Sequence, residues 1–222
     1  MKEIKILWLY SDLLDLYGDS GNIRILEYYL KKNGFAVKVD SAGIFDELCF
    51  EGYDFIYCGP GKFSNLVSAN EHFRKYAEGF RQCLEKGTPV LFSGSSLVLL
   101  GKSIEDAKGN QYESAGIFDY KAVDLDQVMT LDVVTETDLT ADKIYGFINR
   151  TVRIVDETPE DVYHGYRLHD LWATYLLGPL LVKNPQLLSV LFEKITGIAL
   201  DMSDTLEQKA YLWTIGEFGK VE

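Results

Sequence analysis

The sequence predicts an α/β protein built on a doubly wound, mostly parallel sheet, with a β-rich second half. In the first half, short apolar segments of strand character alternate with segments of helical periodicity, which is typical of a parallel sheet covered by helices. From about Lys121 to Leu177 the helical signals become rare. The chain has 222 residues, 47% of them hydrophobic, which is enough for one well-filled core. Residues 1–222 are therefore predicted to form a single domain.

The first half contains four predicted strands and two predicted helices. Ile23, Leu26 and Leu30 recur at helical spacing, and Gly34 is placed to end that helix. The second of these helices, predicted over 66–86, is a crossover that returns the chain to the fourth strand. In chain order we expect a strand at KILWLY (5–10), a helix in NIRILEYYLKKNG (22–34), strands at FAVKV (35–39) and DFIYC (54–58), a helix over 66–86 and a strand at PVLFS (89–93).

The second half is predicted to extend the sheet less regularly and then to end in helices. Asn184 and Pro185 form a helix start, in which the Asn184 side chain caps the helix and Pro185 lacks an N–H that would have no partner there. We expect helices over 185–196 and 203–214.

Composition excludes several classes of function. The formal net charge is −12 and no Lys/Arg cluster stands out, so no nucleic-acid partner is expected. No apolar run approaches the ~20 residues that cross a bilayer, which predicts a cytoplasmic protein without a membrane span. Cys49, Cys58 and Cys83 show no CxxC spacing, so reduced, mostly buried thiols are expected. The odd number of cysteines and the presence of only three histidines indicate neither a disulfide framework nor a zinc site, and no metal or cofactor is expected.

The loops after Tyr10, Cys58 and Ser93 are predicted to meet, because the carboxyl ends of parallel strands share one edge of a sheet. The segment PVLFSGSSLVLLG (89–101) has the pattern of a strand, a tight turn and the start of a helix. Its small residues Gly94, Ser95 and Ser96 allow backbone N–H groups to approach a ligand, as an oxyanion hole requires. A tight connection without any function is the simpler interpretation of this pattern alone.

Four blocks in order carry a family resemblance: LYSDLLDLYGDSGN (9–22), DFIYCGPG (54–61), PVLFSGSSLVLLG (89–101) and TYLLGPLLVKNP (174–185). They resemble the cobyric-acid-synthase-like class I glutamine amidotransferases, and most closely the glutaminase subunits of lipid II isoglutaminyl synthases. The resemblance implies a flavodoxin-like fold. It also implies a cysteine that attacks the carboxamide of glutamine, a histidine that relays the proton, and a partner synthetase, Mur-ligase-like in the closest subfamily, that receives the ammonia.

Both chemical groups that the resemblance implies are missing. Alignment without gaps, anchored at Pro89 and Gly101, puts Gly94 where the family has its cysteine, and Leu177 stands where the family has its histidine. Neither residue can attack or transfer a proton, which predicts a protein without glutaminase activity.

The surrounding glutamine pocket has changed as well. Leu97 and Val98 replace a Tyr-Gln pair, GPGKF (59–63) replaces a GGGQD-like loop, and GFINRTVRI (146–154) matches the family only partly. Buried groups that lose hydrogen-bond partners commonly cost ~1–3 kcal/mol each, so weak or absent glutamine binding is expected. The predicted pocket consists of Gly59, Gly61, Lys62, Ser93, Ser95, Ser96, Leu97, Val98, Asn149 and Arg153.

Three hypotheses about function remain open. The first is an inactive amidotransferase-like subunit that docks a partner, either a Mur-ligase-like synthetase or a second copy of the chain. The second is an active enzyme with a displaced nucleophile, Ser95 or Cys58, although Val98 stands where a GxSxG motif needs glycine and a packed strand-end thiol is the simpler interpretation of Cys58. The third is a small-molecule sensor that uses the remodelled apolar pocket.

Candidate bases and exposed aromatic residues are few. Only His72, His164 and His169 are available as bases, and core or surface histidines are the simpler interpretation.

YGDSGN (17–22) is predicted to form a shaped turn rather than an anion site, because it lacks GxGxxG and a P-loop lysine. Most of the 14 tyrosines should fill the core, and Tyr28, Tyr29 and Trp172 are the aromatic residues whose exposure would indicate a partner surface.

Overall fold

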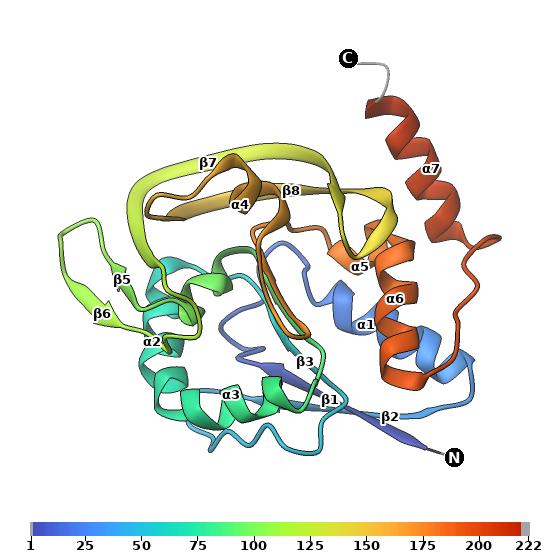
Figure 1. Cartoon of the computed structure of the whole chain (residues 1–222), viewed down its shortest axis with the longest axis horizontal. Coiled ribbons are helices and arrows are strands. Elements are labelled where there is room, and N and C mark those ends of the chain that lie inside the picture. The colour runs from blue at the N-terminus through green and yellow to red at the C-terminus, as the bar shows by residue number, and fades with distance from the viewer. Residues whose placement is uncertain (1, 219–222) are drawn as a thin grey trace.

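The computed structural model describes residues 2–218, except for the side chain of Asp126, and contains two sheets (Figure 1). The first sheet has the order β2-β1-β3-β4-β10-β9. Its neighbours run parallel except for the antiparallel pair β9–β10. The strands are β1 (Glu3–Leu9), β2 (Ala36–Ala42), β3 (Phe55–Cys58), β4 (Val90–Ser93), β9 (Tyr166–Leu168) and β10 (Leu171–Thr174). The prediction of an α/β protein with a mostly parallel sheet in its first half is confirmed.

Helices lie on both sides of these strands (Figure 1). In Figure 1, α2 and α3 lie on one side, whereas α1, α5 and α6 lie on the other. Every residue of the short strands β3, β4 and β10 is buried, which explains why these segments read as continuous apolar runs rather than as alternating ones. The helices are α1 (Gly21–Lys32), α2 (Phe63–Phe73), α3 (Ala77–Glu85), α4 (Pro159–His164), α5 (Leu180–Lys183), α6 (Pro185–Thr196) and α7 (Leu206–Phe218).

The single crossover helix predicted over 66–86 is wrong. The chain forms α2 and α3 instead, joined by the 3₁₀ turn η1 (Arg74–Tyr76), because Tyr76 leaves the helical region with φ −109° and ψ 11°. On either side of the break, Phe73 and Phe80 both pack against Phe92 of β4. The apolar periodicity continues through the turn, so the sequence pattern alone did not reveal it.

A long β-hairpin dominates the second sheet, whose order is β6-β5-β7-β8. Its strands are β5 (Ser103–Glu105), β6 (Gln111–Glu113), β7 (Lys121–Thr137) and β8 (Thr140–Ile154). The register of β7 against β8 shifts between Asp124 and Met129. An isolated antiparallel bridge joins Phe147 of β8 to Leu177, which lies just beyond β10. This hairpin is the predicted β-rich second half, and the bridge places it beside the first sheet.

Pro185 begins α6 as predicted, but the Asn184 side chain does not cap the helix. It is fully buried, accepts a hydrogen bond from the Tyr145 backbone N–H at 2.9 Å, and donates to the carbonyl oxygens of Tyr145 and Leu180. The predicted cap is therefore wrong, because the side chain satisfies the buried backbone of β8. The next helix, α7, begins at Leu206 rather than at 203, since the Thr205 hydroxyl accepts the Gln208 N–H at its first turn.

The described part of the chain has no helix with the length and apolarity that crossing a bilayer requires. Its three cysteines are free, with Cys58 and Cys83 buried and Cys49 exposed.

Candidate functional site

The loops that follow β1, β3 and β4 meet at one edge of the first sheet, as predicted. Backbone hydrogen bonds join Leu16 to the carbonyl oxygen of Pro60 at 3.1 Å, and the Ser96 hydroxyl donates to the carbonyl oxygen of Cys58 at 3.1 Å. Parallel pairing of β1 with β3 and of β3 with β4 produces this arrangement.

Gly94 forms a sharp elbow at the end of β4. Its φ of +61° lies in the left-handed region, where glycine lacks the strain that a side chain would bring. The seven-residue 3₁₀ segment η2 (Gly94–Leu100) follows, where the pattern predicted the start of a helix, and all its residues are buried. A strand, a sharp turn and a helical segment form the geometry in which hydrolases mount a nucleophile. The backbone geometry is therefore present, although the residue at the elbow has no side chain.

Leu177 fills the space in front of Gly94. A Cβ atom built on Gly94 would lie 2.5 Å from Cδ2 of Leu177 and 2.8 Å from Cβ of Pro60, both closer than real Cβ contacts. Leu177 is fully buried, and its backbone is held by two hydrogen bonds with Phe147. Gly94 and Leu177 are thus in contact, and apolar atoms fill the space in front of the elbow.

The hydroxyl groups of Ser95 and Ser96 on the elbow form hydrogen bonds with backbone atoms. Ser95, 6% exposed, donates to the carbonyl oxygen of Gly61 at 3.0 Å and accepts from the Gly61 N–H at 3.2 Å. Ser96 donates to the carbonyl oxygens of Cys58 and Ser93. Ser95 therefore ties the elbow to the loop after β3, and both of these hydrogen-bond partners are backbone atoms rather than a base.

Cys58 is a packed strand-end thiol. It is fully buried, and burial raises its pKa far above the usual range of a thiol, so the reactive thiolate is disfavoured. None of the three histidines is paired with it: the His72 ring lies 3.0 Å from the Tyr10 hydroxyl, and the His164 ring lies 2.9 Å from the Thr135 hydroxyl. His169 is exposed between β9 and β10.

Next to the elbow lies a buried polar cluster, formed by Asp19, Asn22, Tyr57 and Ser93, whose importance the sequence reasoning did not recognise. The carboxylate of Asp19 accepts hydrogen bonds from the hydroxyls of Tyr57 and Ser93 through one oxygen, Oδ2. Asn22 donates to the Tyr57 hydroxyl at 3.3 Å and accepts the Leu181 N–H at 2.8 Å. Burial raises the pKa of Asp19, while the hydroxyl hydrogen bonds partly oppose that shift. The segment YGDSGN contained a signal for this cluster. A carboxylate in a turn at the carboxyl edge of a sheet indicates a site to which several loops contribute.

The remaining predicted pocket residues lie either on the elbow and the loop after β3 or on strand β8. Leu97 and Val98 are fully buried core residues, and a Cβ atom on Gly59 would lie 2.6 Å from the carbonyl oxygen of Leu14, so the loop after β3 is close-packed. Gly61 lies against the Leu14 side chain, and Lys62 is exposed just before α2.

Asn149 and Arg153 lie on the face of β8 opposite the buried side chains of Arg150 and Val152. Arg153 is exposed and lines a cavity of about 410 Å³ together with residues of α4, including Tyr163.

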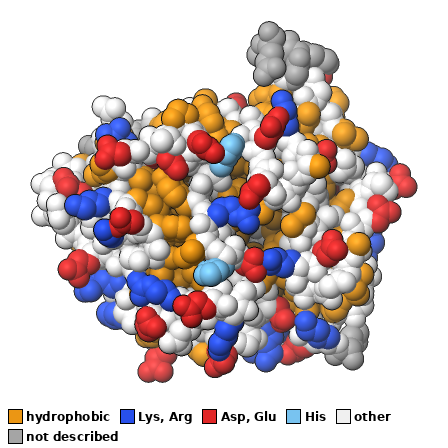
Figure 2. All heavy atoms as spheres, viewed as in Figure 1, with side chains coloured by type: hydrophobic (Ala, Val, Ile, Leu, Met, Phe, Trp, Pro, Cys, Tyr) orange, Lys and Arg blue, Asp and Glu red, His pale blue; other side chains and the backbone are white. Residues whose placement is uncertain are grey.

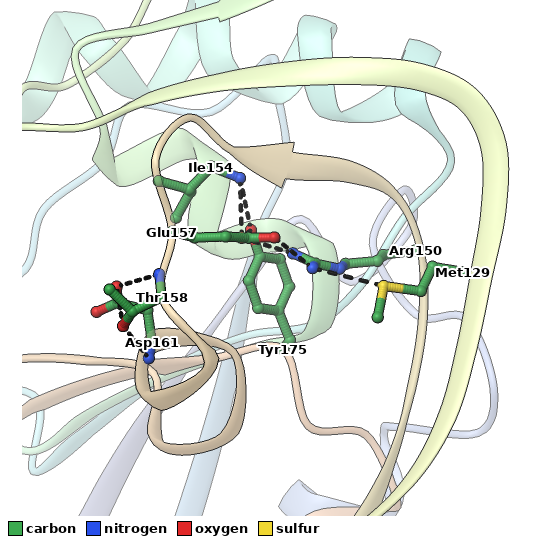
Figure 3. Close-up of polar contacts among 7 residues, drawn as sticks. All are labelled: Met129, Arg150, Ile154, Glu157, Thr158, Asp161 and Tyr175. Atoms are coloured by element: carbon green, nitrogen blue, oxygen red, sulfur yellow. Dashed lines mark hydrogen bonds and ion pairs between the residues drawn. The ribbon is translucent and has the colours of Figure 1, made fainter.

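That cavity borders a buried ion pair between Arg150 and Glu157 (Figure 3). The two side chains are 4% and 11% exposed, and two hydrogen bonds of 2.9 and 2.5 Å join them. Figure 3 shows Tyr175 beside both side chains. The centroid of its ring lies 3.8 Å from Cζ of Arg150, and its hydroxyl donates to Glu157 at 3.0 Å. The Ile154 N–H also donates to Glu157. Every charge in this network has a partner, which indicates a structural role.

Comparison with known proteins gives one consistent family. Residues 5–184 match the model of the CobB/CobQ-like glutamine amidotransferase domain. The chain is 30% identical to the lipid II isoglutaminyl synthase (glutamine-hydrolyzing) subunit GatD of Staphylococcus aureus, over 87% of this chain and 85% of the relative. Identity to the GatD subunit of Streptococcus pneumoniae is 26%, over 83% and 77% of the two chains. A cobyrinate a,c-diamide synthase of Caldanaerobacter subterraneus is 28% identical over 64% of this chain and 30% of that enzyme.

Proposed function

Because the chain belongs to the CobB/CobQ-like glutamine amidotransferase domain family, we propose that it is an amidotransferase-like subunit without glutaminase activity. Its function is to dock a partner, a Mur-ligase-like synthetase. The observation that carries the proposal is the contact between Gly94 and Leu177 at the elbow. On this proposal, a flavodoxin-like, doubly wound scaffold in the cytoplasm has been kept for binding.

The loss of activity follows from the chemistry of acyl transfer. Glutamine hydrolysis by a covalent route needs a nucleophile within reach of the carboxamide and a group that carries the proton to the leaving ammonia. Gly94 provides no nucleophile, and Leu177 provides no proton carrier. Leu177 and Pro60 also occupy the volume that a side chain at position 94 would need. On this proposal, the site has lost its reactive groups and the space for them.

The alternative, an active enzyme with a displaced nucleophile, has less support. The Ser95 hydroxyl is bonded on both sides to Gly61, and the raised pKa of buried Cys58 opposes thiolate formation. A third hypothesis, a sensor in the remodelled pocket, needs space that the close packing of Leu177, Pro60 and Leu14 takes up at the elbow and the neighbouring loop.

A docking role is supported by what the chain retains. The elbow keeps its left-handed turn, and the hydroxyls of Ser95 and Ser96 keep the rim loops together. Two relatives that the chain matches over most of their length are named as subunits, which favours a partner protein for this chain as well.

An ammonia-release assay tests the proposal. The purified chain is incubated with glutamine, alone and with a Mur-ligase-like protein, and we expect no release above the uncatalysed rate. The Ser95→Ala and Cys58→Ala variants are matched controls that should behave like the wild type. Turnover that either substitution abolishes would establish the displaced-nucleophile alternative. Isothermal titration of the chain into the Mur-ligase-like protein tests docking separately, and a flat titration would refute that part.

A further inference from the structure

A cavity of about 130 Å³ opens between the first sheet and α6, at the edge of the sheet opposite the elbow. Phe55 and Val90, which line it, are the first residues of β3 and β4, whereas the elbow follows the last residue of β4. The strand register pairs Trp172 of β10 with Leu91 of β4 and with Arg167 of β9, so these three side chains share one face of the sheet. The cavity is therefore separate from the site at the elbow.

The interior of this cavity is apolar. Leu187, Leu191 and Lys194 are spaced by four and three residues, so they share the side of α6 that closes the cavity. The indole N–H of Trp172 already donates to the carbonyl oxygen of His164 at 2.8 Å. An engineered apolar cavity of about 150 Å³ in another protein binds benzene, so this space accommodates an aliphatic side chain or at most one small ring. Its apolar lining includes Phe55, Leu91, Trp172, Leu187, Val190 and Leu191.

Three charged residues also line the cavity, and each is held in an ion pair. Lys194 lies 2.5 Å from Asp170, in the turn between β9 and β10. Arg167 lies 2.7 Å from Asp138, at the tip of the hairpin between β7 and β8. In Figure 2, basic and acidic side chains lie next to one another near the centre of the face, over the first sheet and beside α6. Partly exposed ion pairs are weak, so the charges of a ligand can replace them at little cost.

We propose that this cavity binds an apolar α-amino acid of the leucine class, with its aliphatic side chain inside and its two charges at the ion pairs. The carboxylate pairs with the guanidinium of Arg167, whose parallel N–H groups match carboxylate geometry, and the ammonium pairs with Asp170. A ligand with one charge would meet a like charge as well as an opposite one here, whereas a zwitterion presents an opposite charge to each. The inference does not depend on the proposed loss of glutaminase activity.

Isothermal titration of the full chain with free amino acids tests the site. We expect saturable binding of leucine with a dissociation constant on the order of 1 mM or tighter. Alanine lacks three carbons of the leucine side chain, each of which contributes about fourfold in affinity when buried, so it should bind at least about thirtyfold more weakly. Tryptophan, whose ring system exceeds the cavity, should not bind.

Two analogues of leucine test its charges separately. 4-Methylpentanoate lacks the ammonium group, and 3-methylbutylamine lacks the carboxylate. Each should bind at least about tenfold more weakly than leucine, because one charge at the cavity then gains no partner. Binding of either analogue as tightly as leucine would exclude a site for a zwitterion.

Variants distinguish the cavity from binding elsewhere on the surface. Val190→Phe adds a ring at the cavity from a position that is 39% exposed, so it should abolish leucine binding while the chain still folds. Asp170→Asn and Arg167→Gln each remove a charge that the ligand needs, and each should raise the dissociation constant at least about tenfold. Lys102→Gln breaks an exposed ion pair with Asp119, far from α6, and is the matched control that should leave the affinity unchanged.

Thermal unfolding gives a second measurement. Leucine should raise the unfolding temperature of the wild type and of Lys102→Gln but not that of Val190→Phe, because a ligand stabilises only a folded state that binds it. Circular dichroism of every variant verifies that it is folded. No saturable binding of leucine up to about 10 mM would overturn the proposal, as would binding that Val190→Phe leaves unchanged.

Discussion

Two buried regions adjoin the same stretch of chain, and they differ in polarity: one is apolar and the other contains an ion pair. Leu177 closes the elbow at Gly94 with apolar atoms, whereas Tyr175, two residues earlier, covers the Arg150–Glu157 ion pair. The first region has the backbone geometry of a reactive centre without a reactive group. The second has two charges and a phenol, all hydrogen-bonded to one another or to backbone.

The difference shows that buried polarity by itself does not identify a site. In the ion-pair region each polar group already satisfies its neighbour, so no group is left to bind or transform a ligand. At the elbow, the left-handed φ of Gly94 is the feature that resembles a reactive centre. The polar cluster around Asp19 differs from both regions. Its carboxylate oxygen Oδ2 accepts two hydroxyl hydrogen bonds, whereas Oδ1 is buried and has no hydrogen-bond partner among the described residues.

The largest effect is expected from breaking the ion pair. Glu157→Gln leaves the Arg150 guanidinium buried and uncompensated, which should lower the free energy of unfolding by about 3–5 kcal/mol. Asp138→Asn, which breaks the exposed pair with Arg167, should cost at most about 1 kcal/mol. Urea denaturation of both variants measures the difference. Similar small losses would mean that the buried network contributes no more than a surface contact.

A smaller effect is expected from filling the elbow. Gly94→Ala adds a Cβ atom at positive φ and against Leu177, and should cost about 2–4 kcal/mol. Gly109 also has a positive φ but nothing within 4 Å of its Cβ position, so Gly109→Ala should cost only about 1–2 kcal/mol of strain.

Adding Leu177→Ala to Gly94→Ala tests whether the contact with Leu177 causes the extra cost. In a double-mutant cycle by urea denaturation, the cost of Gly94→Ala should fall toward that of Gly109→Ala. Strict additivity of the two substitutions would show that Leu177 does not seal the elbow.

The smallest effect concerns pH. Burial raises the pKa of Asp19 above its ordinary value of 3.8, so the folded protein holds this proton more tightly than the unfolded chain does. The stabilising contribution is complete below about pH 4 and is lost as pH rises through the folded pKa, with a slope of at most about 1.4 kcal/mol per pH unit. Asp19→Asn should remove this slope, so the variant should gain stability relative to the wild type from about pH 4 upward.

Denaturation midpoints over a pH series measure this change. Asp40→Asn is the control, because Lys38 lowers the pKa of the partly exposed Asp40, so its contribution appears as pH rises and is lost in acid. Parallel curves for the wild type and Asp19→Asn would contradict the raised pKa.

Several elements were predictable because their signals are local. The buried strands and the helix that begins at Pro185 can both be recognised from neighbouring residues. Other features depended on distant partners. Asn184 was predicted to cap a helix but bonds Tyr145, which is 39 residues away, and the partners of Asp19 at Tyr57 and Ser93 are 38 and 74 residues away.

The sequence by itself determined the alternation of strands and helices in the first half and the family resemblance. These properties depend on residue type and short-range periodicity, which the chain displays without folding. Only the tertiary structure decided that Leu177 and Pro60 occupy the space in front of Gly94, that Cys58 and Ser95 are held in structural contacts, and that Trp213 faces water. Contacts between segments set burial and pairing, and these depend on how sheets and helices pack in space.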